Sequence, residues 1–223
     1  MSTNPESDTR ERLLDAAEKL FAANGIGATS LRAVTAEAKA NLASIHYHFG
    51  SKDALLFEVF ARRIKPVNAR RLTLLGAVER DTPGDLSAIV RAFVSPALEL
   101  LSRPEMGGRN VTVLIGRLYT EPMQIRLEIL TMFEEVATRF TAAISASLPH
   151  LDPVELFWRF HFMVGSMAFP MVAGDIVEAR ARQIGEVSDV DKNIDRLVRF
   201  ISGGLAAPAT EDDAVSKEDQ GED

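Results

Sequence analysis

His46 and His48 are the two side chains in the chain that most readily raise the question of metal chemistry. They stand two positions apart in a segment expected to be helical, so their side chains point to different faces. Metal ligands on one helix prefer spacings of three or four residues. We therefore expect no metal at this pair.

Catalytic chemistry has little support in the sequence. The chain has no cysteine, which excludes a thiol nucleophile, a disulfide and a Cys-based metal site. It shows no paired carboxylate with its base, no Gly-rich phosphate loop and no nucleophile elbow. We expect no catalytic residue and no cofactor, and we keep an all-helical enzyme acting on a hydrophobic metabolite as an alternative, with Arg117 or His161 in its site.

Arg117 and His161 are polar residues in apolar surroundings. Arg117 lies on the apolar segment 111–118, and His161 stands between two phenylalanines. Each either has a structural partner or meets a polar group of a ligand. Aromatic and Met side chains can line a cavity beside them, although such a stripe is more often plain core. The candidate ligand-binding residues are Phe93, Arg117, Phe140, Trp158, His161, Phe162, Met163 and Met167.

The elements that must position these residues are helices. Apolar residues recur at three-to-four spacing from Thr9 to Ala23, which marks one buried helix face. Asp8 and Glu11 have the spacing of an N-terminal capping box. Gly25, after Asn24, can end this helix in a left-handed conformation.

Two short helices follow, the first capped by Thr29 or Ser30 and the second starting after Asn41. A long helix begins after Ser51, and Pro66 should kink it or end it. No run alternates apolar and polar residues long enough to indicate a strand, so we expect an all-α fold. Further helices are expected near residues 84–102, 110–120, 122–147, 153–184 and 188–205.

The segment from Thr29 to Leu55 resembles the DNA-binding signature of the TetR family (TetR/AcrR type). The likeness combines a Thr-Ser opening, Ala38 closing one helix, small Ala43 starting the next, then Tyr-His-Phe at 47–49 and Lys-Asp-Ala-Leu at 52–55. It covers roughly residues 9–65 at motif level. The resemblance implies an N-terminal three-helix helix-turn-helix domain, followed by a larger C-terminal helical domain for ligand binding and dimerisation.

In such a unit the second helix of the helix-turn-helix lies in the major groove, which presents a distinct pattern for each base pair. The resemblance then places residues 41–44 and 46 at the bases. It places Thr29, Tyr47, His48 and Lys52 at backbone phosphates, and Phe49 in the small core. The full set of expected DNA-binding residues is Thr29, Ser30, Arg32, Asn41, Leu42, Ala43, Ser44, His46, Tyr47, His48 and Lys52.

Two residues depart from the usual family pattern. Lys39 stands where the turn commonly has Gly, and it carries backbone strain if the position needs a positive φ. His46 stands where Tyr or Asn is common, which leaves the operator sequence open.

The resemblance divides the chain into a flexible N-terminus at 1–8, the DNA-binding domain at 9–65, the regulatory and dimerisation domain at 66–206 and a disordered acidic tail at 207–223. It implies three partners: a palindromic double-stranded DNA operator, a second copy bound through the last two helices, and a small, largely hydrophobic effector. The function expected is a ligand-responsive repressor. A ligand-independent DNA-binding or scaffold protein is the alternative.

The net charge of −7 is unusual for a protein that binds DNA. The tail after residue 208 holds seven acids and one lysine, so it supplies six of the seven excess negative charges. Residues 29–65 hold six bases against three acids.

The polar N-terminus shows no signal-peptide pattern, which favours a cytoplasmic location. The most apolar stretch, 162–173, is about a dozen residues, whereas a membrane span needs about twenty, so we expect no membrane association.

Overall fold

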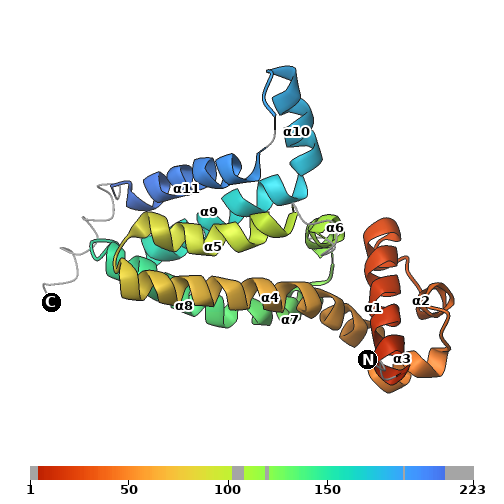
Figure 1. Ribbon diagram of the computed structural model, residues 1–223. Coiled ribbons are helices and arrows are strands. Elements are labelled where there is room, and N and C mark those ends of the chain that lie inside the picture. Colours follow the sequence, from red (N-terminus) through yellow and green to blue (C-terminus); the bar gives the residue numbers. More distant parts are fainter. Residues whose placement is uncertain (1–4, 102–107, 119–120, 188, 209–223) are drawn as a thin grey trace, which may run out of the picture. The chain divides into compact units, whose positions relative to one another are not determined.

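The computed structural model describes residues 5–101, 108–118, 121–187 and 189–208. Within these ranges the chain is helical and contains no strand, in agreement with the all-α expectation (Figure 1). The helices are α1 (Pro5–Asn24), α2 (Leu31–Glu37), α3 (Leu42–His48), α4 (Lys52–Asp81), α5 (Leu86–Leu101), α6 (Gly108–Leu118), α7 (Met123–Leu130), the short 3-10 helix η2 (Thr131–Phe133), α8 (Glu134–Ser147), α9 (Pro153–Val172), α10 (Gly174–Gln183) and α11 (Val190–Ala206).

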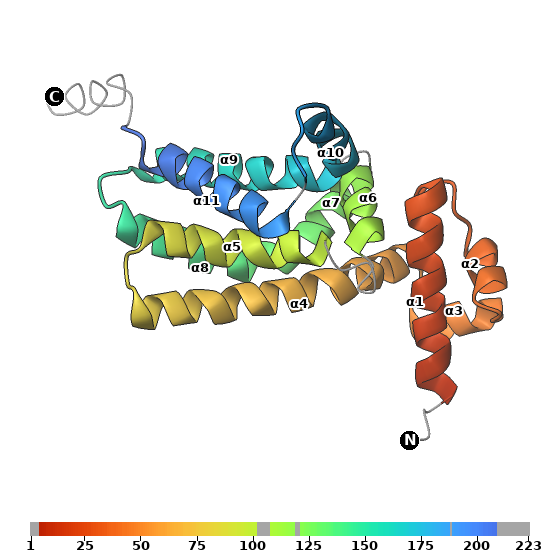
Figure 2. The ribbon, with the colours of Figure 1, turned by 45° about the horizontal axis from the view of Figure 1, so that its top comes forward.

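The first of two compact units comprises Met1–Arg71 and Pro96–Val136. In this unit α1, α2 and α3 pack on one another (Figure 2). They share one hydrophobic core. Leu114 of α6 and Ile129 of α7 belong to the same core. The helix-turn-helix segment is therefore packed directly against helices that come much later in the sequence.

The second unit comprises Leu72–Ser95 and Ala137–Asp223. Its interior holds an edge-to-face aromatic group in which the ring of Phe93 lies 5.1 Å from that of Phe140 and 5.8 Å from that of Phe160. The helix α11 runs along α9, and Ile194, Val198, Ile201 and Leu205 form its buried face. These contacts make α9 and α11 one packed pair.

Two expected helix boundaries are wrong. The helix α1 begins at Pro5, so Asp8 lies inside it and pairs with Arg12 at 3.0 Å instead of capping its start. At Pro66, where a kink or an end was expected, α4 does not end but continues to Asp81. Because a proline in a helix costs about 3 kcal/mol, the burial of later side chains such as Leu75 must offset the loss.

The single helix expected over residues 153–184 is also wrong, because α9 and α10 are separate. Ala173 between them has φ −105° and ψ 20°, outside the α-helical range. Pro170 lies in the last turn of α9 and lacks a donor for the helix. The two helices bend by 74° at this break.

No single helix in the described ranges is long and apolar enough to cross a membrane. Only α9 and α10 taken together, across their bend, meet the requirements of length and composition.

Candidate nucleic-acid interface

The start of α3 is fixed by a capping side chain. The Oδ1 atom of Asn41 accepts a hydrogen bond from the Ser44 amide at 2.8 Å and a second from the Ser44 hydroxyl at 2.9 Å. Ile45 is fully buried and anchors the opposite side of the helix in the core. With its start capped and its inner face anchored, this seven-residue helix presents a fixed outer face.

The outer face of α3 carries the residues expected at the bases. Leu42, Ala43 and His46 are exposed, as is Asn41 before them. His46 is held by Nδ1, which lies 3.1 Å from the Gly50 carbonyl oxygen. Apart from Ser44, which is half-buried and bonded to the cap, the structure brings the expected base-contacting residues together on one exposed surface.

The remaining residues expected to bind DNA lie on α3 and near the starts of α2 and α4. Tyr47 has 74% of its surface exposed, and its ring packs edge-on against His48 at 5.0 Å. Lys52 is half-buried at the start of α4, with Nζ 3.4 Å from the Gly27 carbonyl oxygen. Arg32 is exposed on α2, and Ser30 caps that helix by accepting from the Ala33 amide at 3.1 Å.

The phosphate contact expected for Thr29 is not supported by the structure. Its side chain is buried, and its hydroxyl donates to the carbonyl oxygens of Gly25 at 2.8 Å and Leu20 at 3.2 Å. Thr29 therefore closes the end of α1 instead of facing solvent.

The turn between α2 and α3 has the strain expected at Lys39. This residue has φ +51°, the only positive φ of a non-glycine residue in the described chain. A left-handed conformation costs such a residue about 1–2 kcal/mol. The turn is held by backbone hydrogen bonds on either side, from the Ala38 amide to the Val34 oxygen and from the Ala40 amide to the Thr35 oxygen, both 2.9 Å.

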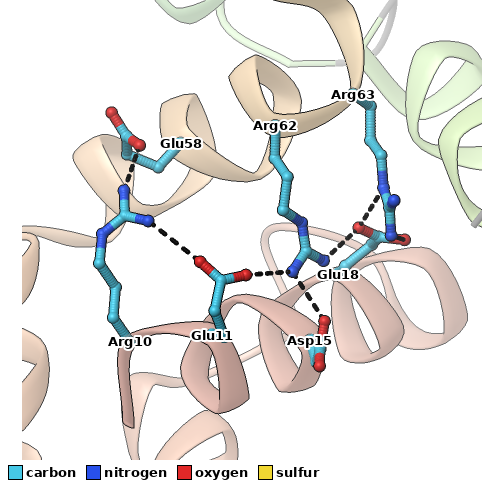
Figure 3. Close-up of polar contacts among 7 residues, drawn as sticks. All are labelled: Arg10, Glu11, Asp15, Glu18, Glu58, Arg62 and Arg63. Atoms are coloured by element: carbon cyan, nitrogen blue, oxygen red, sulfur yellow. Dashed lines mark hydrogen bonds and ion pairs between the residues drawn. The ribbon is translucent and has the colours of Figure 1, made fainter. Parts of the chain in front are cut away.

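An ion-pair network fixes α1 against α4 (Figure 3). The Glu18 carboxylate is almost fully buried and accepts from Arg62 at 2.6 Å, while Arg63 binds both of its oxygens at 3.0 Å. Asp15 and Glu11 accept from the other side of Arg62 at 2.7 and 3.4 Å. Burial acts to lower the pKa of Arg62, but the hydrogen bonds and charges of Glu18 and Asp15 outweigh it and raise that pKa above its usual value.

The ion-pair network extends to the end of α3 through Arg10. Arg10 pairs with Glu58 of α4, and its guanidinium also stacks over the Phe49 ring at 5.5 Å. Phe49 is half-buried and packs against the core, in the role expected for it. The residue that ends α3 is thus connected to the same set of charges as α1 and α4.

Arg117 connects α6 to the end of α1. Its Nε donates to the Ala22 carbonyl oxygen and its Nη2 to the Ala23 carbonyl oxygen, both at 3.1 Å. The last carbonyls of a helix have no partner within it, so Arg117 caps α1 from outside. Gly25, at φ +93°, has no side chain and so leaves space for the Arg117 guanidinium. A Cβ at this position would lie 2.9 Å from Nη1 of Arg117. The structural partner considered for Arg117 is therefore present.

The other candidate ligand-binding residues do not form one group. Phe93, Phe140, Met163 and Met167 are buried in the second unit. On α9, by contrast, three candidates face outward: Trp158 and Phe162, with 52% and 64% of their surfaces exposed, and His161, whose Nδ1 lies 2.7 Å from the Phe157 oxygen of its own helix. The structure therefore does not support a cavity lined by all eight candidates.

Besides Glu18, the structure buries two further charges that the sequence does not mark, Arg71 and Arg159. Burial lowers the pKa of Arg71 to about 10, and its Nη1 donates to Asn68 at 3.1 Å. Arg159 of α9 donates to the Leu205 carbonyl oxygen at 2.7 Å and to Glu155 at 2.6 Å. Arg159 thereby caps α11 and holds it on α9.

No group of three His, Asp or Glu residues within the described ranges is arranged to hold a metal ion.

We expect Asn41→Ala to lower the free energy of unfolding by about 1 kcal/mol, because α3 loses its cap. DNA affinity should fall more than this loss alone explains, since the recognition helix frays at the end that reaches the bases. Asp85→Ala is the matched control, because Asp85 caps α5 through the Ala88 amide at 3.0 Å. Urea denaturation and gel-shift titration would measure both effects, and equal losses of DNA affinity in the two variants would contradict this role of Asn41.

A strained turn joins two short helices, and the second of these shows a capped, exposed polar face above a common core. These features define a helix-turn-helix protein. Comparison with known proteins agrees: residues 13–59 match the domain described as bacterial regulatory proteins, tetR family, and residues 91–204 match the tetracyclin repressor-like C-terminal domain. The chain belongs to the TetR family of regulatory proteins.

Individual relatives are more distant. The nicotine-responsive transcriptional repressor HdnoR of Paenarthrobacter nicotinovorans is 43% identical over 110 residues, which are 45% of this chain and 53% of HdnoR, about half of its length. The repressor KstR of Rhodococcus jostii is 26% identical over 154 residues, 61% of this chain and 72% of KstR. The structure of FadR from Bacillus subtilis in complex with stearoyl-CoA shares the fold, with a TM-score of 0.69 at 12% identity over 87% of this chain and 98% of FadR.

Proposed function

We propose that this protein is a transcriptional repressor that binds a palindromic operator as a dimer and leaves it when a small, largely hydrophobic effector binds. The exposed face of α3 carries the proposal: it displays Leu42, Ala43 and His46 on a helix whose start is capped and whose inner face is buried. A single helix of this kind fits the major groove. Two such helices about 34 Å apart bind one face of the duplex.

His46 is a base-reading residue in this proposal. When Nδ1 of the neutral ring donates to the Gly50 oxygen, Nε2 is left as an acceptor. An acceptor in the major groove pairs with the amino group of adenine or cytosine. In this proposal Tyr47, His48 and Lys52 contact phosphates, and such contacts position the protein without reading sequence.

The dimer forms through the outer faces of α9 and α11. On α9, Val154, Phe157, Trp158 and Phe162 have between 52% and 68% of their surfaces exposed, and Phe200 of α11 has 70%. Contiguous exposed apolar side chains mark interaction sites, and aromatic residues are enriched in interface cores. The exposed position of Trp158 and Phe162 is thus explained by a partner subunit.

The effector binds among the apolar side chains of the second unit. The rings of Phe140 and Phe160 pack there on Phe93, and Met163 and Met167 are buried in the same unit. Met side chains adapt easily to varied apolar shapes. One relative is named as nicotine-responsive, and another was crystallised with stearoyl-CoA. Both compounds have large apolar parts, which supports an effector of this general character.

The response travels by two connections. The helix α4 runs without a break from the helix-turn-helix to Asp81, and Arg117 holds α6 to the end of α1. An effector beside Phe93 acts on α5, which carries that ring and continues into the first unit ahead of α6. By displacing α4 directly, or α6 by way of α5, it changes the positions of the two recognition helices. Effector and operator then oppose each other by reciprocal linkage.

This response is tested by calorimetry after a thermal-shift screen of apolar compounds that begins with nicotine and stearoyl-CoA. A compound that binds the folded state raises the melting temperature. We expect the affinity of the protein for this compound, measured by isothermal titration, to fall by about 5–150-fold when operator DNA is bound. This is the usual range of allosteric coupling. Equal affinity with and without operator would contradict the proposed release.

A further inference from the structure

The helix α3 is held at its end as well as at its capped start. Phe49 directly follows the helix, and its amide donates to the Ile45 carbonyl oxygen at 2.8 Å. The guanidinium of Arg10, on α1, lies over the Phe49 ring, 5.5 Å from the ring centre. A cation in this position is attracted by the aromatic face. Arg10 therefore holds the residue that ends α3.

The same guanidinium binds α4 (Figure 3). Nη2 of Arg10 donates to the Glu58 carboxylate at 2.5 Å, and Nη1 donates to Glu11, its neighbour on α1, at 3.4 Å. The side chains of Arg10 and Glu58 remain 37% and 36% exposed. One partly exposed side chain thus joins α1, α4 and the end of α3.

A row of rings continues from this point to the exposed surface of α3. The rings of Phe49 and His48 lie 6.1 Å apart, and those of His48 and Tyr47 lie 5.0 Å apart, edge-on. His48 is half-buried, whereas Tyr47 is exposed. A shift of Phe49 is therefore passed to the two side chains that contact phosphates in the proposed complex.

The contacts of Arg10 contribute little to the stability of the fold. Ion pairs and cation–π contacts that stay partly in water are weak, and the hydrophobic core shared by α1, α3 and α4 holds these helices together. Phosphate contacts, by contrast, fix the register and orientation of a protein on the duplex. A small displacement at the end of α3 thus matters more for DNA binding than for folding.

We propose that Arg10 is a positioning residue for operator binding. Held by Glu58, it fixes the Phe49 ring and thereby directs His48 and Tyr47 toward the phosphates. Since Glu58 lies on α4, a displacement of that helix also reaches the end of α3 through Arg10. The inference rests on the proposed binding of DNA by α3.

The test is a gel-shift titration of full-length variants on a duplex that the wild type enriches from a random-sequence library. Arg10→Gln releases the Phe49 ring. Arg12→Gln removes the same charge from the same helix but breaks only an exposed pair with Asp8. We expect Arg10→Gln to weaken binding by about three- to tenfold more than Arg12→Gln does. Arg10→Lys, which keeps a cation, should recover most of the loss.

A second matched pair opposes positioning to simple electrostatics. Glu58→Gln and Asp8→Asn each remove one negative charge, which by itself favours binding to DNA. Glu58→Gln also frees Arg10 from α4, so we expect this variant to bind severalfold more weakly than the wild type. Asp8→Asn should bind as the wild type does or slightly more tightly. Tighter binding by Glu58→Gln would overturn the positioning role.

Salt dependence separates positioning from a direct phosphate contact. Removing a side chain that itself binds a phosphate reduces the slope of log affinity against log salt by about one, so Arg10→Gln should keep the slope of Arg12→Gln. A slope reduced by about one, or equal affinities of these two variants, would overturn the inference. So would a much lower stability of Arg10→Gln in urea, because the residue would then hold the fold. A wild type that enriches no duplex would instead overturn the proposed function.

Discussion

Replacing Glu18 with alanine should lower the free energy of unfolding by about 3 kcal/mol. The carboxylate is almost fully buried and is bound by both Arg62 and Arg63. Removing one partner of a buried ion pair costs about 3–5 kcal/mol, because the remaining charges lose their compensation. We expect the lower end of this range, since both arginines keep about a fifth of their side-chain surface in water.

Asp15→Ala is the control for this change. Asp15 binds the same Arg62 at 2.7 Å, but 69% of its side chain is exposed, and exposed pairs contribute only about 0–1 kcal/mol. Urea denaturation followed by circular dichroism would measure both variants. If Glu18→Ala costs no more than Asp15→Ala, the buried part of the network does not hold α1 on α4.

Replacing Arg117 with alanine should weaken the coupling between effector and operator. The variant loses both hydrogen bonds to the end of α1, so a displacement of α6 no longer moves the helix-turn-helix. We expect the ratio of effector affinities without and with operator to fall severalfold below its wild-type value, itself in the usual range of about 5–150, because only the connection through α4 remains. Operator affinity itself should change less, because Arg117 lies on α6 and not on the DNA-reading helix α3.

Gly25→Ala tests the same connection from the other side. A Cβ at this position would lie 2.9 Å from Nη1 of Arg117, and alanine there would also be strained at φ +93°. Gly84 has a similar φ of +82°, but a Cβ there would meet nothing within 4 Å. Gly25→Ala should therefore weaken the coupling, and Gly84→Ala, which carries a similar backbone strain, should leave it intact. Isothermal titration on each variant would show this, and full coupling in Arg117→Ala would mean that the response runs through α4 alone.

The helix-turn-helix could be predicted from the sequence because its signals are local. The stop at Gly25, the cap at Ser30 and the apolar spacing of α1 each act within a few residues, and each has its expected place in the structure. The strained turn at Lys39 was predictable for the same reason. Local signals also explain why one helix was expected over residues 153–184. The helical spacing of apolar residues continues across the break that Pro170 and the residues after it introduce at the end of α9.

The contacts that were not predicted join residues far apart in the chain. Glu18 and its two arginines are 44 and 45 residues apart, and Arg117 lies 95 residues from Ala22. The sequence shows that Arg117 is a charge in an apolar setting, but its partner is a pair of backbone oxygens, which no residue type marks. Thr29 differs from these, because its hydroxyl donates to carbonyl oxygens only four and nine residues away. No residue type marks that the hydroxyl turns back onto the end of α1.

Selection of duplexes from a random-sequence DNA library by the purified protein tests the central claim most directly. Tyr47→Ala is the control, because this exposed side chain lies on α3 and contributes nothing to the core. We predict enrichment of a palindrome with half-sites about one helical turn apart, bound by the wild type and much more weakly by the variant. Enrichment of no sequence above the Tyr47→Ala background would contradict DNA recognition by α3.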